Sequence, residues 1–216
     1  MKTNNPKLFF SVLYPTLFVA LLWFIKLVET AENISLASYG LYPRTIHGLL
    51  GIITSPLLHA DFSHLFANSI PLLILGSVIL YFYRSIAFQI FLWVYLMTGL
   101  WVWVAARNAY HIGASGIIYS FVTFLFFSGL FRKNTSLLAI SMFVVFLYGS
   151  TAWGILPLKN GTSWESHLLG SLAGLIAAYF YRNEGPENQK YELDDDEEID
   201  PESYKGDESN EVNVLE

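Results

Sequence analysis

Six apolar stretches, each close to the length of a membrane-spanning helix, constrain the fold of this chain more than any other feature. A helix needs about 20 residues to cross the hydrocarbon core of a bilayer, and a charge near the middle of that core is costly. Arg84 lies in one of the short turns between stretches, and Arg132 and Lys133 lie in another. The sequence therefore predicts an all-α membrane protein with six transmembrane helices. The expected spans are residues 8–28, 62–83, 86–106, 113–131, 135–156 and 164–182.

The net charge of −6 belongs to the C-terminal end of the chain and not to its apolar part. Residues 184–216 contain two lysines and 14 acidic residues, a net charge of −12, which leaves +6 for residues 1–183. An acidic segment with few aromatic residues is typical of disorder. We therefore expect a six-span membrane domain at 1–183, a disordered acidic cytoplasmic tail at 184–216, and no nucleic-acid partner.

The basic residues predict how the chain crosses the membrane. The N-terminus is short and basic, and the apolar stretch after it has no small-residue cleavage site, which favours a retained first span. The Lys and Arg bias between alternate loops places both termini in the cytoplasm. Residues 29–61, punctuated by Gly and Pro, are expected to form an interfacial first loop with short amphipathic helices on the outer face. An ordinary extracytoplasmic loop is the alternative.

The segment Gly113-Ala114-Ser115-Gly116 stands at the start of the fourth span. Serine is a weak nucleophile unless a base takes its proton, and in membrane helices it more often serves packing. Here Gly113 and Gly116 leave the backbone accessible, and free N–H groups at a helix N-terminus can face a developing oxyanion. Tyr119 lies one turn further along, on the same face as Ser115. This placement favours a chemical role for the serine.

His167 begins the pattern His167-x-x-Gly170-x-x-x-Gly174 in the sixth span. A lone histidine near the end of a span is often a hydrogen-bonded packing residue. The two glycines, however, allow this helix face to approach another helix closely, and the glycines around Ser115 allow the same. The imidazole is then within reach of the serine hydroxyl, as a general base must be. Glu165 points to a different face and is expected in a loop, so the sequence predicts a Ser–His dyad.

A third polar group surrounds the start of the second span. His64 and Asn68 are four residues apart, hence on one helix face, and both carry N–H donors of the kind that stabilise an oxyanion. A hydrogen-bonded packing cluster is the first alternative. A metal site of His59, Asp61, His64 and His167 is the second, and it leaves the Gly-Ala-Ser-Gly segment without a purpose. The chain has no cysteine, which excludes thiolate nucleophiles and thiolate metal sites.

These motifs, in this order, resemble those of the rhomboid intramembrane serine proteases. The resemblance covers residues 8–182 and implies Ser115 as the nucleophile, His167 as the base, and neither a cofactor nor a metal. It implies an oxyanion hole formed by His64, Asn68 and the Ser115 backbone N–H, with Tyr119 packed beside the histidine. The residues expected to support this site are Gly113, Gly116, Gly170, Gly174 and His59.

The resemblance also implies an activity and a location. We expect a serine endopeptidase that cleaves transmembrane segments of membrane proteins through an acyl-enzyme. Its partners are transmembrane protein substrates and the lipid bilayer, and its location is a bacterial inner membrane. Span five at 135–156 corresponds to the family's lateral gate, and 157–163 to a cap. Where the family's first loop usually carries Trp-Arg, this chain has Pro43-Arg44, which leaves the anchoring of that loop open.

Two other functions stay open at this stage. A non-proteolytic rhomboid-like protein would bind transmembrane clients without cutting them, and it would need neither Ser115 nor His167. A small metal or solute transporter is expected to pair ionisable residues at mid-span. Spans one, three and five contain no acidic residue, which argues against the transporter.

Overall fold

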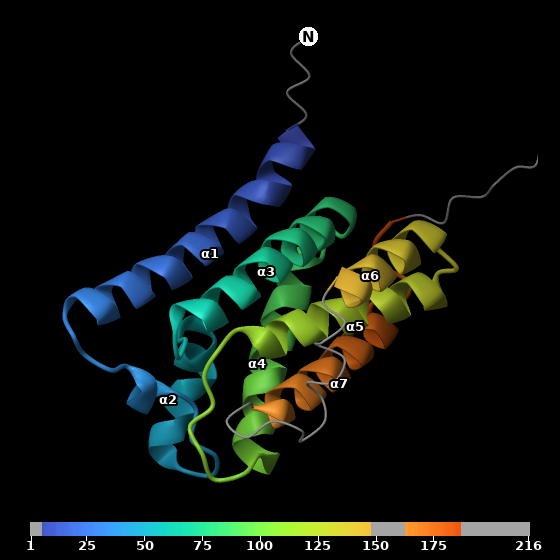
Figure 1. The fold of residues 1–216 in the computed structure, drawn as a ribbon. Coiled ribbons are helices and arrows are strands. Elements are labelled where there is room, and N and C mark those ends of the chain that lie inside the picture. Colours follow the sequence, from blue (N-terminus) through green and yellow to red (C-terminus); the bar gives the residue numbers. More distant parts are fainter. Residues whose placement is uncertain (1–5, 148–162, 187–216) are drawn as a thin grey trace, which may run out of the picture.

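Every regular element of the described chain is helical, which confirms the expected all-α class (Figure 1). The computed structural model describes residues 6–147 and 163–186. Its α-helices within those ranges are α1 (Pro6–Ala31), α2 (Ile46–Thr54), α3 (Phe62–Phe82), α4 (Ala87–Ala105), α5 (Ser115–Phe131), α6 (Thr135–Leu147) and α7 (Trp164–Phe180). Two short 3-10 turns, η1 (Ala37–Tyr39) and η2 (Ser55–Leu57), lie on either side of α2.

Each predicted span contains a helix. By length and composition, α1, α3 and α4 are able to cross a membrane, and α5 is a shorter apolar helix of 17 residues. Helix α5 begins at Ser115, two residues later than predicted, because Gly113 and Ala114 belong to the preceding turn. The rest of the predicted fifth span, the predicted cap up to residue 162 and the tail beyond residue 186 lie outside the described residues.

Helix α5 is the central element of the bundle. It packs against α3, α4, α6 and α7, whereas α1 packs mainly on α3 (Figure 1). Phe124 and Leu125 of α5 are fully buried, as are Leu75 of α3 and Ile90 of α4. Because its neighbours enclose it, the position of its first residue is fixed relative to the rest of the bundle.

The most extensive helix contact joins α5 to α7. A Cβ atom added to Gly170 would lie 2.2 Å from the carbonyl oxygen of Gly116, and one added to Gly174 would lie 2.1 Å from that of Ser120. Real Cβ atoms do not approach so closely, so the two backbones touch where α7 has glycine. The predicted close packing of this helix face is confirmed.

The segment between α1 and α3 contains the short helices that were predicted there, and it is anchored to the end of α4. The indole of Trp103 donates a hydrogen bond of 2.8 Å to the carbonyl of Thr45. The guanidinium of Arg44 donates to the carbonyls of Val104 and Ala106, at 3.2 and 2.7 Å. Helix C-terminal carbonyls lack intrahelical partners, so these bonds satisfy α4 and hold the first loop in place.

A polar cluster closes the opposite end of the bundle. The hydroxyls of Tyr83 and Ser128 are 2.7 Å apart, and both side chains are almost completely buried. Arg132 donates to Ser128 Oγ at 3.2 Å and to the carbonyls of Tyr181 and Pro186 at 2.7 and 3.3 Å. One buried guanidinium thus ties the segment after α7 to α5, and through Ser128 to the end of α3.

Replacing Gly174 by valine should separate α5 from α7, because the new side chain would overlap the Ser120 carbonyl. Overpacking of this kind should lower the melting temperature in detergent by at least about 5 °C. Leu172→Val, on an exposed side chain of the same helix, is the matched control. Equal melting temperatures for Gly174→Val and wild type would contradict the close contact.

Candidate active site

Ser115 and His167, which the sequence pairs as nucleophile and base, lie in direct contact. His167 Nε2 is 2.8 Å from Ser115 Oγ. Ser115 is the first residue of α5, and His167 lies in the first turn of α7. His167 is only 6% exposed. The contact of α5 with α7 therefore brings the two side chains together at the same end of both helices.

Tyr119 completes this side of the site. Its ring stacks on the His167 imidazole, with centroids 4.2 Å apart and planes 11° from parallel. Both rings are buried, so the stacking restricts rotation of the imidazole and keeps Nε2 directed at the serine. The expected packing of tyrosine beside the histidine is confirmed.

The turn before Ser115 has a conformation that requires glycine. Gly113 has φ +112°, which residues with a Cβ rarely adopt, and its N–H donates to the carbonyl of Ser55 at 2.8 Å. A Cβ on Gly113 would lie 2.6 Å from His64 Cε1 and 3.7 Å from Asn68 Nδ2. Two predicted oxyanion-hole residues therefore lie against the backbone that leads into the serine.

Asn68 presents an amide with no acceptor. The residue is 4% exposed, and no described residue accepts a hydrogen bond from its Nδ2. A buried donor without an acceptor costs free energy. The Asn68 amide is therefore expected to gain a hydrogen bond when an acceptor is placed beside Ser115. An anionic oxygen at the serine would supply the missing acceptor.

His59 supports the ring of His64 from behind. The two rings meet edge to face with centroids 5.1 Å apart. Burial, with a smaller contribution from the neighbouring His64, lowers the pKa of His59 to about 4, so the ring is neutral at pH 7. The backbone at His59 and Ala60 accepts two hydrogen bonds from Lys26, each 3.0 Å long. These contacts give His59 a structural place beside the site.

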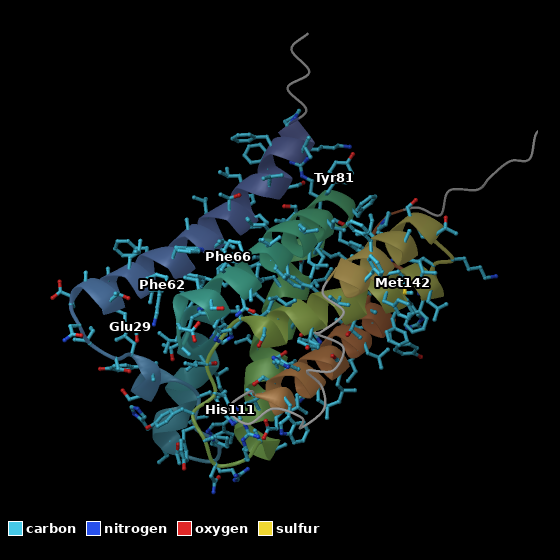
Figure 2. All side chains as sticks on the ribbon, in the orientation of Figure 1. Glu29, Phe62, Phe66, Tyr81, His111 and Met142 are labelled. Carbon is cyan, nitrogen blue, oxygen red and sulfur yellow. The ribbon has the colours of Figure 1, made fainter. Side chains whose placement is uncertain are left out.

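The sequence did not identify the ion pair that holds this loop. Lys26 Nζ lies 2.8 Å from Glu29 Oε2. Glu29 lies near the end of α1 (Figure 2). Glu29 also accepts a hydrogen bond from the backbone N–H of Leu36. The only signal in the sequence is the i, i+3 spacing of opposite charges within an apolar helix, where an unpaired charge is costly.

The expectation that Glu165 lies in a loop is wrong. Glu165 belongs to the first turn of α7 and is 6% exposed. Negative charge at a helix N-terminus interacts favourably with the helix dipole, and Arg107 Nε lies 3.5 Å from its Oε1. Glu165 was expected in a loop because it does not share a helix face with His167, and its contact with the distant Arg107 is not visible in the local pattern.

His111, the other histidine near the serine in sequence, faces a different partner. Its Nδ1 contacts Ser163 Oγ, and its Nε2 contacts the carbonyl of Arg107 at 3.1 Å. Burial lowers its pKa. Its backbone also pairs with that of Leu41. These contacts join the first loop, the turn before α5 and the start of α7 around the site.

The candidate metal ligands do not converge. Within 6–147 and 163–186, no three His, Asp or Glu side chains are placed to share one metal ion. Asp61, one of the four candidates, instead accepts a hydrogen bond of 2.7 Å from the N–H of His64 and caps α3. The arrangement of Ser115, its histidine and the nearby N–H donors is instead suited to acyl transfer through a tetrahedral intermediate.

Comparison with known proteins identifies relatives over most of the chain. Residues 47–184 match the Rhomboid domain family. The chain is 37% identical over 176 residues to uncharacterized proteins of Mycobacterium tuberculosis and Mycobacterium bovis, covering 75% of this chain and 71% of each relative. An uncharacterized protein of Mycobacterium leprae is 34% identical over 172 residues, with 75% and 68% covered. The matched range contains Ser115, His167, His64 and Asn68.

Proposed function

Because the chain belongs to the rhomboid family, we propose that it is an intramembrane serine endopeptidase that cleaves transmembrane segments of membrane proteins. The observation that carries this proposal is the 2.8 Å contact between Ser115 Oγ and His167 Nε2. A serine placed on an unprotonated imidazole nitrogen is the arrangement that activates a hydroxyl for attack. A protein that only bound clients would have no use for it.

In the proposed mechanism, Ser115 Oγ attacks the scissile carbonyl while His167 Nε2 takes the hydroxyl proton. The tetrahedral intermediate collapses, His167 returns that proton to the leaving amine, and an acyl-enzyme remains. Water then attacks the ester, with its proton again passing to Nε2 and from there to Ser115 Oγ. His167 thus needs its own proton on Nδ1, and the stack with Tyr119 holds the ring in that orientation.

The oxyanion hole is proposed to consist of the Ser115 backbone N–H, the Asn68 amide and the His64 ring. The first amides of a helix have no intrahelical acceptor, and Ser115 is the first residue of α5. Asn68 Nδ2 has no described acceptor. Donors held in place before the charge develops are worth more than donors that must reorient. His59 is assigned a positioning role behind His64.

The topology that fits this mechanism has six spans, with both termini in the cytoplasm of a bacterial inner membrane. A 17-residue helix is about 25 Å long, less than the roughly 30 Å of the hydrocarbon core. With the far end of α5 at the inner boundary, Ser115 lies below the outer surface and can meet a membrane-embedded substrate. The segment 29–61 is proposed to lie in the outer interface. Residues 184–216 form the proposed separate tail.

Helix α6 is the proposed lateral entrance, as the family resemblance implies. Its described part packs mainly on α5. Met142, Phe143 and Phe146 are more than half exposed (Figure 2 labels Met142). A helix held by one neighbour is easier to displace than one enclosed on several sides. The substrate helix must also unwind, since its carbonyls are engaged in i→i−4 hydrogen bonds. This requirement favours Gly, Pro or polar residues near the cut, with a small residue before it.

Ser115→Ala should abolish cleavage of a transmembrane reporter reconstituted with the purified protein, because it removes the hydroxyl that lies 2.8 Å from His167 Nε2 and attacks in the proposed mechanism. Ser63→Ala, an exposed serine near the same end of the bundle, should cleave at the wild-type rate. Equal cleavage by Ser115→Ala and wild type would remove Ser115 from the mechanism. A folded wild-type protein that binds transmembrane segments without cutting any would instead favour the client-binding alternative.

Asn68→Ala should lower kcat by about 10²-fold or more with little change in KM, since the amide acts on the transition state. Asn68→Asp should lower kcat as well, because it retains the size and removes the donor. Asn134→Ala, which removes the Leu137 cap at the other end of the bundle, is the control. An unchanged kcat in both Asn68 variants would make this residue a packing element.

A further inference from the structure

An apolar groove lies between α1, α3 and α4, toward the end of the bundle that holds the α3–α4 turn. Its volume is about 530 Å³, and Phe121 of α5 is one of its lining residues. Phe18 of α1 and Phe88 and Phe91 of α4 supply aromatic walls. Helices α1 and α3 meet at Pro15 and Gly76, where a Cβ on the glycine would lie 3.1 Å from the proline ring. The groove has the size of a small-ligand pocket.

A second, more polar cavity of about 290 Å³ adjoins this groove. Tyr14 and Leu80 line both, so the two cavities are adjacent and are treated together as one pocket. Lys7 and Arg84 line the second cavity, and both residues are exposed. Among the described residues that line either cavity, none is acidic. The pocket is therefore apolar along most of its length and cationic at its end.

We propose that this pocket, formed by the groove and the cationic cavity, binds an anionic phospholipid. The acyl chain would lie along the aromatic walls of the groove, and the phosphate would lie between Lys7 and Arg84. Arginine and lysine form charge-assisted hydrogen bonds with phosphate oxygens. Tyr14, at the junction, has the apolar ring and polar hydroxyl that suit the boundary between chains and headgroups.

The order of groups along the pocket argues for a lipid over other ligands. A soluble anion would use the two cations and leave the groove empty. A lipid with no negative group would use the groove and gain nothing from the two cations. Only an amphiphile with a negative headgroup matches both parts. With the proposed topology, the lipid site lies in the cytoplasmic leaflet, on the other side of the bilayer from Ser115. Lipid binding can therefore be measured independently of the proposed protease activity.

The test is lipid binding to the full chain in detergent, measured by native mass spectrometry. The protein carries Ser115→Ala in every sample, so that cleavage plays no part. We expect dioleoyl-phosphatidylglycerol to bind at least about tenfold more tightly than dioleoyl-phosphatidylcholine, as expected from two cations facing an anionic lipid. The double variant Lys7→Gln/Arg84→Gln should lose this preference. Lys133→Gln, an exposed cation that lines neither cavity, should retain it.

A second pair of variants tests the apolar part. Leu80→Trp should obstruct the junction and weaken phosphatidylglycerol binding, whereas Tyr81→Trp, at an exposed neighbouring position near the end of α3 (Figure 2), should not. Melting temperatures check that each variant is folded. Equal binding of the two lipids, or an equal loss of preference in Lys133→Gln, would overturn the proposal. So would displacement of the lipid by millimolar inorganic phosphate, which would indicate an anion site without the groove.

Discussion

The contact between the backbones of α5 and α7 is the constraint on which the site depends. In a bilayer, lipid is as apolar as the side chains, so helices associate through close packing and interhelical hydrogen bonds. Gly170 and Gly174 allow α7 to touch the carbonyls of Gly116 and Ser120. The close spacing of the α5 and α7 backbones sets the distance between His167 and Ser115. Any side chain larger than hydrogen at either glycine would move the base away from the serine.

The residues around Ser115 and His167 are held rigidly, and one buried donor among them, the Asn68 amide, has no described acceptor. Gly113 places its turn against His64, and the ring of Tyr119 lies flat on His167. Lys26 holds the loop before α3 through two carbonyls. Against this fixed background, the buried Asn68 amide has no described acceptor. The rigid packing keeps this donor in place although it lacks a hydrogen bond, and an oxyanion beside Ser115 would supply the acceptor.

The sequence predicted the parts of this protein that depend on local pattern. Hydropathy located the helices, and the spacing of His167, Gly170 and Gly174 predicted the face that packs on α5. Contacts between residues that are far apart in the sequence were harder to predict. Glu165 was expected in a loop, because its partner Arg107 is far away in sequence and the local pattern does not show their contact. The cluster around Arg132 was not predicted, for a related reason. A charge between two apolar stretches indicates an exposed turn. Here, however, the Arg132 side chain is buried, and its guanidinium donates to backbone carbonyls.

The central claim is that His167 makes Ser115 nucleophilic, and the most direct measurement is covalent capture of that serine. The purified protein would be treated with a small alkyl fluorophosphonate, and the modified residue would be located by peptide mass spectrometry. We expect a single adduct on Ser115, formed at least about a hundredfold more slowly in a folded His167→Ala variant, since a general base contributes that much or more. Equal labelling rates in the two proteins, or an adduct on another serine, would contradict the claim.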